Sequence, residues 1–507
     1  MDRKGVVEFV FVGDARRIFL PDFKRVRAAE RRFRGLRCIH THLSSEPLTR
    51  DDLTDLALLR LDMMASIDVT KEGLPGHVRA AYLSPSAGNG NPGEQAWDFL
   101  EPRIPSQLDL DFLEFIEALE REFADKRGEL RRSDGRERAI LVGVTTGSAE
   151  AERESLEELA ELARSSEVVV LDSIVQKRPK LDPRYLVGKG KIEDLVIASL
   201  QHGADIIIFN QDLTPAQVRE ISAATDLKIL DRTQLILDIF SRRAASREGK
   251  LQVELAQLRY LLPRLIGTGT ALSRLMGGIG GRGPGETKLE VDRRRARERI
   301  SRLEREIEQI RRKRGTRRKR RVDRRVPIVS LVGYTNAGKS TLLNRLTRSE
   351  VAAGSRMFET LDPTSRRLRV PVEQEVLLAD TVGFIRDLPP DLISAFRATL
   401  EEIEMSVLII NVVDVSDSHF REQVEAVDGI LEGLHLDSIQ RLTVFNKLDQ
   451  LDPHEAESFR GRKDAVAISA LTGEGSETLV TRIGEIIHEQ MGSDPTRSKS
   501  VENSTDF

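Results

Sequence analysis

One eight-residue stretch of this chain fits the pattern G-x-x-x-x-G-K-[ST], which is typical of a phosphate-binding loop. Its residues are Gly333, Tyr334, Thr335, Asn336, Ala337, Gly338, Lys339 and Ser340. The glycines let backbone N–H groups converge on phosphate oxygens, and a helix N-terminus after the loop adds partial positive charge. We therefore expect Lys339 to reach the β- and γ-phosphates and Ser340 to ligate Mg²⁺.

A second motif follows at the distance that a nucleotide site requires. Residues 375–379 predict a strand, and the D-x-x-G motif comes directly after it as Asp380, Thr381, Val382 and Gly383. We expect Asp380 to hold a water bound to Mg²⁺ and the Gly383 N–H to lie near the γ-phosphate.

A third motif selects the base. Residues 443–445 predict a strand that leads into N-K-x-D, formed by Asn446, Lys447, Leu448 and Asp449. An aspartate there accepts hydrogen bonds from guanine N1–H and its 2-amino group, and adenine offers no such donors. A fourth segment, Ser469, Ala470 and Leu471, is placed to hold guanine O6 through its backbone. Four motifs in this order predict a GTPase.

The set of residues that would catalyse hydrolysis is less complete than the set that binds the nucleotide. Phe384 follows Gly383, where Ras-like GTPases carry a glutamine that orients the attacking water, so we expect slow intrinsic hydrolysis and a partner that completes the site. Asn336 is similar to the asparagine of GTPases that use K⁺ in place of an arginine. Thr360 and Thr364 are both candidates for a second Mg²⁺ ligand, and spacing does not separate them.

Short apolar strands and helix starts position these motifs. Residues 329–332 and 407–413 predict buried parallel strands, and residues 341–346 begin a helix directly after the phosphate loop. We therefore assign residues 326–491 to an α/β P-loop GTPase domain with a doubly wound, mostly parallel sheet. We expect residues 492–507 to form a disordered tail.

The length and composition limit the classes of protein to which the whole chain can belong. A chain of 507 residues predicts two to four domains, and its net charge of −3 is close to balanced. One cysteine excludes an internal disulfide and indicates a reducing compartment. We see neither a transmembrane run nor a signal peptide, and we expect a soluble, cytoplasmic monomer with no integral membrane association.

Residues 1–135 predict a small mixed α/β domain of unknown role. We expect strands at 6–12 and 36–39, helices at 51–67 and 108–126, and a polar linker at 131–138.

This domain contains a possible metal motif. His40 and His42 form H-x-H at a predicted strand end, and Asp52 follows, a set that can bind Zn²⁺. With Glu8 upstream and Thr49 before Asp52, it resembles a shortened metal motif of JAMM/MPN metalloproteases, although the usual proline is replaced by Leu43 and the spacing to Asp52 is one residue short. The alternative is two strand-end histidines followed by a helix that Thr49 or Asp51 caps.

Residues 138–235 alternate strand and helix, which predicts a small parallel sheet. Thr214 and Pro215 are a typical N-cap and first helical residue. The segment 187–191 has either an anion site at a helix N-terminus or a tight turn with solvated lysines.

Residues 236–325 predict a basic helical hairpin. A heptad seam of Ile300, Leu303, Ile307 and Ile310 favours an antiparallel coiled coil, and a glycine-rich tip spans 277–285. Nine of the eleven residues from 311 to 321 are Lys or Arg. Such a run is either a solvated linker or a phosphate-binding surface, and the few aromatics favour structured RNA over single strands.

The GTPase motifs together with residues 231–240, 251–258 and 277–294 resemble the HflX family of GTPases over about residues 138–490. The resemblance implies a GTPase that binds the large ribosomal subunit and its rRNA and splits stalled or hibernating ribosomes. It places the glycine-rich tip toward the peptidyl-transferase centre.

A family string, F-x-T-L-D-P-T, selects Thr360 as the Mg²⁺ ligand and adds its neighbours to the nucleotide site: Phe358, Glu359, Leu361 and Asp362. The residues expected to act in hydrolysis are Lys339, Thr360, Gly383 and Asn336. Two alternatives are a non-ribosomal RNA-remodelling NTPase and an added metal hydrolase in residues 1–135.

Overall fold

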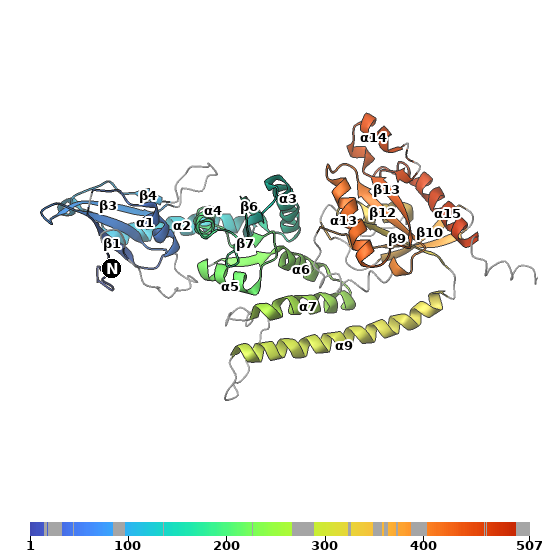
Figure 1. Ribbon diagram of the computed structural model, residues 1–507, viewed down its shortest axis with the longest axis horizontal. Coiled ribbons are helices and arrows are strands. Elements are labelled where there is room, and N and C mark those ends of the chain that lie inside the picture. Colours follow the sequence, from blue (N-terminus) through green and yellow to red (C-terminus); the bar gives the residue numbers. More distant parts are fainter. Residues whose placement is uncertain are drawn as a thin grey trace, which may run out of the picture. The chain divides into compact units, whose positions relative to one another are not determined.

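A computed structural model of the protein describes residues 1–14, 18, 33–43, 45–84, 97–134, 136–225, 227–265, 288–322, 326–347, 357–358, 364–371, 374–386, 403–460, 462 and 464–492. The described chain divides into two compact units, Met1–Arg232 and Thr233–Phe507 (Figure 1). The predicted loop at 88–93, the glycine-rich tip at 277–285 and the tail beyond residue 492 lie outside the described residues. Among the described helices, none is long and apolar enough to span a bilayer.

The first unit begins with a four-stranded mixed sheet in the order β1-β2-β3-β4. The strands are β1 Arg37–His42, β2 Met63–Val69, β3 Pro75–Leu83 and β4 Trp97–Phe99. Helix α1 (Arg50–Leu58) connects β1 to β2, which are parallel, whereas β3 and β4 pair antiparallel. The short 3-10 helix η1 (Pro105–Gln107) and the long helix α2 (Phe112–Asp134) follow. Buried Leu56, Met64 and Ile116 join α1, the sheet and α2 into one core.

Three expectations for this domain were wrong. Residues 6–12 form no strand, and Val10 and Val12 are 79% and 94% exposed. The predicted helix 51–67 ends at Leu58, and its second half is strand β2, because a strand buried on both faces has no alternation that distinguishes it from a helix. Helix α2 continues to Asp134, through much of the predicted linker.

The second sheet of this unit is parallel, as expected, in the order β6-β5-β7-β8. Its strands are β5 Arg138–Thr145, β6 Val169–Lys177, β7 Ile206–Phe209 and β8 Lys228–Asp231, connected through α3 Ala149–Ser165, α4 Lys189–His202 and α5 Pro215–Ala224. The Thr214 hydroxyl accepts from the Gln217 N–H and the Gln217 side chain accepts from the Thr214 N–H, which confirms the predicted cap of α5.

Three described α-helices lie between the second sheet and the nucleotide-binding domain. They are α6 Arg232–Arg243, α7 Arg247–Leu261, which leads into the 3-10 helix η2 Leu262–Leu265, and α9 Lys288–Val322. Helices α7 and α9 lie side by side (Figure 1), and the predicted seam is confirmed: Leu251 and Leu255 pack against Leu303 and Ile307.

The last domain is a six-stranded sheet in the order β10-β11-β9-β12-β13-β14. Its strands are β9 Ile328–Gly333, β10 Thr364–Val370, β11 Gln374–Asp380, β12 Leu408–Asp414, β13 Gln440–Asn446 and β14 Ala465–Ala467. Among the strands that the structure describes here, only β10 and β11 pair antiparallel. The described helices are α10 Lys339–Thr347, α13 Phe420–Gly433, α14 Pro453–Arg460 and α15 Ser476–Gly492, with the 3-10 helix η3 Leu448–Gln450 after β13.

Helices α10 and α15 share one apolar cluster with the sheet, and α14 packs in a second cluster with β12 and β13. The doubly wound α/β fold that the sequence predicts is therefore confirmed, preceded by a helical region and two further α/β sheets.

Candidate nucleotide-binding site

Three motifs meet at one edge of the last sheet. The phosphate loop follows β9, the D-x-x-G motif begins at the end of β11, and the N-K-x-D motif begins at the end of β13. Because these strands are parallel members of one sheet, their carboxyl ends lie on the same side, where ligands bind in open α/β folds.

The phosphate loop needs its glycines for conformation and for space. Gly333 has a φ of +146°, and a Cβ there would lie 2.2 Å from the Val412 carbonyl oxygen. Gly338 has a φ of +90°, and its Cβ would lie 2.3 Å from Asn446 Nδ2. Between them Asn336 is left-handed with a φ of +62°, a conformation that asparagine tolerates better than most residues.

Lys339 is buried beneath this loop. Its Nζ donates to the Gly333 carbonyl at 3.1 Å and to the Tyr334 carbonyl at 2.7 Å. Burial lowers the pKa of Lys339 to about 8, although the Asp380 carboxylate opposes this shift. The loop therefore holds a partly desolvated ammonium group, which is suited to an anionic ligand.

Ser340 and Asp380 form a compact pair of oxygen ligands. The Ser340 hydroxyl donates to Asp380 Oδ2 at 2.6 Å, and the Asp380 side chain is fully buried. A hydroxyl and a carboxylate beside a phosphate loop fit Mg²⁺, which prefers hard oxygen ligands. The Thr381 hydroxyl donates to the Leu331 carbonyl at 2.7 Å and so ties this motif to β9.

The D-x-x-G motif is bound directly to the phosphate loop. The Thr335 N–H donates to the Phe384 carbonyl at 2.8 Å, and the Phe384 N–H donates to the Gly333 carbonyl at 3.1 Å. The Phe384 side chain is only 4% exposed. A Cβ on Gly383 would lie 2.9 Å from Thr335 Cα, so the two segments can approach this closely only with glycine there.

The base-recognition motif also contacts the phosphate loop. Asn446 Nδ2 donates to the Ala337 carbonyl at 2.8 Å, and Asn446 Oδ1 accepts from the Ala470 N–H at 2.9 Å. The Ser469 hydroxyl donates to Asp449 Oδ1 at 2.6 Å, which orients that carboxylate. Leu471 is 70% exposed at the end of this segment.

The sequence did not point to Asp414. This residue ends β12, and its Oδ2 lies 2.6 Å from Lys447 Nζ. The pair fixes the left-handed Lys447, whose φ is +67°. The only signal was an acidic residue at the carboxyl end of a buried strand, and nothing near it in sequence marks it.

The segment around Thr360 is described only in part. Glu359, Thr360, Leu361 and Asp362 lie outside the described residues. Phe358 is described, buried, with its ring edge-on to Phe240 of α6 at 4.6 Å between centroids.

The sheet order, the phosphate loop and the two further motifs define a P-loop GTPase. Residues 328–447 match the family described as 50S ribosome-binding GTPase. Residues 153–241 and 243–321 match the families described as GTP-binding GTPase N-terminal and GTP-binding GTPase Middle Region.

Relatives named GTPase HflX are similar over the same part of the chain. The protein from Lacrimispora saccharolytica is 47% identical over 354 residues, which cover 70% of this chain and 84% of the relative. The protein from Caldanaerobacter subterraneus is 48% identical over 62% of this chain and 74% of the relative. The Escherichia coli protein is 44% identical with coverage of 70% and 84%. The chain belongs to the HflX family of GTPases, with about 150 residues preceding the matched region.

Proposed function

We propose that this HflX GTPase binds the large ribosomal subunit and its rRNA, and that it splits stalled or hibernating ribosomes, acting in the cytoplasm as a monomer. The family described as 50S ribosome-binding GTPase, which residues 328–447 match, supports the partner. The observation that carries the proposal is the charge distribution along α9.

Several arginines of α9 up to Arg312 have acidic partners on α7 or α9. Arg299 makes two hydrogen bonds of 2.7 Å to Glu254, and Arg302 and Arg312 pair with glutamates one turn away on α9 at 3.1 Å. From residue 313 to 321 the sequence has seven further Lys and Arg residues and no acidic residue. A segment with mixed charges followed by nine residues that include seven cations and no acidic residue favours a surface for RNA phosphates over a solvated helix.

In this proposal GTP controls the binding to the large ribosomal subunit. In our proposal Lys339 and the loop N–H groups hold the phosphates, Ser340 and Thr360 ligate Mg²⁺, and Gly383 contacts the γ-phosphate. Mg²⁺ neutralises the charge on the β- and γ-phosphates. Asp449 selects guanine, and hydrolysis releases the segments around Thr360 and Gly383, and with them the ribosome.

Cosedimentation tests the partner. Purified full-length protein, incubated with large subunits and a non-hydrolysable GTP analogue, is expected to pellet with the subunits, and to remain in the supernatant with GDP. Light scattering of intact ribosomes should fall when protein and GTP are added together. Equal pelleting with both nucleotides would rule the proposal out.

A charge-deletion variant tests α9. R317A/R318A/K319A should weaken subunit binding and reduce the slope of log K against log salt by about one for each phosphate that the variant no longer neutralises. The control R441A/R460A/R482A removes three arginines that pair with acidic residues of the GTPase domain and should bind subunits like the native chain. An RNA-remodelling NTPase would retain its activity after deletion of residues 277–285, whereas ribosome splitting should be abolished.

A further inference from the structure

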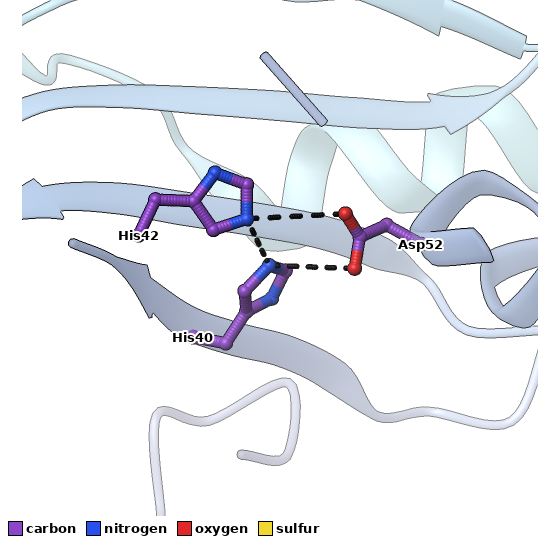
Figure 2. A group of neighbouring side chains, drawn as sticks. All are labelled: His40, His42 and Asp52. Carbon is purple, nitrogen blue, oxygen red and sulfur yellow. Dashed lines mark hydrogen bonds and ion pairs between the residues drawn. The ribbon is translucent and has the colours of Figure 1, made fainter. Parts of the chain in front are cut away.

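Three side chains of the N-terminal domain bring ligand atoms together. His40 and His42 project from the same face of β1, because residues two apart on a strand share a face. Asp52, in the first turn of α1, reaches the same point (Figure 2). Their nitrogen and oxygen atoms all lie within 4.8 Å of one another, and no other such group of His, Cys, Asp and Glu occurs among the described residues.

The distances between these ligand atoms are close to those around a tetrahedral zinc ion. Two ligands at about 2.0–2.1 Å from a tetrahedral zinc ion lie about 3.4 Å apart. Here His40 Nε2 lies 3.0 Å from His42 Nε2 and 3.4 Å from Asp52 Oδ1, and His42 Nε2 lies 3.9 Å from Asp52 Oδ2. The two distances to Asp52 involve its two different oxygens, and the ligand atoms of the three residues all lie within 4.8 Å of one another, so an ion between them needs a modest rotation of the carboxylate.

A hydrogen bond fixes which nitrogen of His42 faces the group. His42 Nδ1 lies 3.0 Å from the Glu46 carbonyl oxygen, which can only accept, so Nδ1 carries the proton. Nε2 of the neutral ring then presents a lone pair toward His40 and Asp52. Histidines that bind metals are oriented in this way, through a carbonyl or carboxylate on the other ring nitrogen.

The loop that supplies this carbonyl is itself held in place. Ser45, next to Glu46, donates to Asp68 Oδ2 at 2.9 Å, and Arg79 binds both Asp68 Oδ1 and the Ser45 hydroxyl, at 2.5 and 3.0 Å. Asp68 is only 6% exposed. These contacts join β2 and β3 to the loop after β1, so the orientation of His42 is determined by the sheet.

Asp52 is oriented by the helix start. Its Oδ2 accepts from the Thr49 N–H at 2.8 Å and from the Thr49 hydroxyl at 2.7 Å, which leaves Oδ1 directed at His40. In addition, Ser66 pairs in register with His40 on the neighbouring strand, so it lies on the same face of the sheet. Ser66 is fully buried, and its hydroxyl has no hydrogen-bond partner within the described structure. A buried polar atom without a partner therefore lies on the face of the sheet that carries His40.

We propose that His40, His42 and Asp52 bind one Zn²⁺ ion, in the unit that does not contain the nucleotide site. Two imidazoles and a carboxylate suit zinc, whereas Mg²⁺ prefers oxygen alone. Three protein ligands leave the fourth position for water or a substrate oxygen, as in catalytic rather than structural zinc sites. The proposal does not depend on ribosome binding.

Metal analysis of the full-length protein, loaded with GDP and Mg²⁺ and dialysed against buffered free Zn²⁺, tests the proposal. We expect about one zinc per native chain. H40A/H42A and D52N should weaken zinc binding by about tenfold or more, and D52N retains an N3 side chain that can still cap α1. H77A changes an exposed histidine of the same sheet, and S340A changes the phosphate loop; both should retain the zinc.

Cobalt replacement makes the test independent of whether the variants fold. Co²⁺ bound by the native chain should give the intense visible absorption of a four-coordinate ion, and added Zn²⁺ should abolish it. The proposal is overturned if native protein and H40A/H42A take up the same zinc, if the Co²⁺ spectrum is that of the aqueous ion, or if iron occupies the site in place of zinc.

Discussion

Asn446 and Ala337 are joined by a 2.8 Å hydrogen bond from the asparagine amide to the loop carbonyl. This bond fastens the base-recognition motif to the phosphate loop, and the second bond of Asn446, from the Ala470 N–H, adds the segment proposed to hold guanine O6. One buried side chain thus sets the distance between the two ends of the nucleotide site.

Asn446→Ala should therefore weaken GDP binding roughly tenfold or more and lower the free energy of unfolding by about 2 kcal/mol, because two buried partners lose their bonds. The control is Asn411→Ala in β12. Asn411 is equally buried, but its Oδ1 has no partner among the described residues, so its replacement should have a smaller effect on GDP affinity. Fluorescent GDP titration and urea unfolding measure both quantities. Equal losses in the two variants would contradict this role.

Asp449→Asn should change base preference. The carboxylate accepts from guanine, whereas an amide also donates, and xanthine carries a carbonyl where guanine carries its 2-amino group. We expect GDP affinity to fall about 100-fold and XDP affinity to rise. Ser469→Ala removes the 2.6 Å contact that orients Asp449 and should weaken GDP without favouring XDP. Competition titrations with GDP, XDP and ADP measure the order, and an unchanged order would refute the assignment.

Gly333→Ala should abolish nucleotide binding. Its Cβ would overlap the Val412 carbonyl, at 2.2 Å, in a backbone conformation that alanine disfavours, and we expect an unfolding penalty of about 2 kcal/mol or more. Gly429 in α13 is the matched control: nothing lies within 4 Å of its added Cβ, and Gly429→Ala should stabilise the domain by about 0.5–1 kcal/mol. Thermal unfolding with and without GDP compares them, and a native-like Gly333→Ala would disprove the steric argument.

The sequence predicted which motifs meet at the carboxyl ends of the last sheet, because each motif is contiguous and follows a strand. It missed Asp414, whose partner Lys447 is distant in sequence, and it misread β2 as helix, because a strand buried on both faces lacks alternation. In the N-terminal domain the helix cap and the metal ligand were alternatives. The structure confirms Thr49 as the N-cap of α1, and Asp52 completes the capping box through Oδ2 while its Oδ1 faces His40. Sequence patterns cannot show such a division between two oxygens of one side chain.

The left-handed Asn336 allows a clean test of K⁺ dependence. If its side chain helps to hold K⁺ at the phosphates, GTP hydrolysis should be at least about tenfold faster in KCl than in NaCl. Asn336→Gly removes the side chain without a backbone penalty and should abolish the difference, whereas Asn336→Ala adds strain as well. Phosphate release at matched ionic strength measures the rates. Equal rates of the native protein in both salts would rule out a K⁺ site.

Lys339 should couple nucleotide binding to proton uptake. Its pKa is lowered from 10.5 to about 8 by burial, and phosphates would favour the charged form. Above about pH 8, binding must therefore add a proton, and GDP affinity should fall by up to about tenfold per pH unit. The free energy of unfolding of the nucleotide-free protein depends on pH in the opposite direction. Between pH 8 and 10.5 the unfolded chain binds more protons at this group, so its contribution to the free energy of unfolding increases with pH.

Titrations of GDP at pH 7, 8 and 9, and calorimetry at pH 9 in two buffers of different ionisation enthalpy, measure this proton uptake. Lys339→Arg is the control, because a guanidinium remains charged over the whole range. This variant should bind GDP more weakly, and the pH dependence of its affinity should come only from the ionisation of guanine itself. The difference in proton uptake between the two proteins is then the contribution of Lys339. If the native protein and Lys339→Arg take up the same number of protons at pH 9, the buried ammonium does not have the lowered pKa.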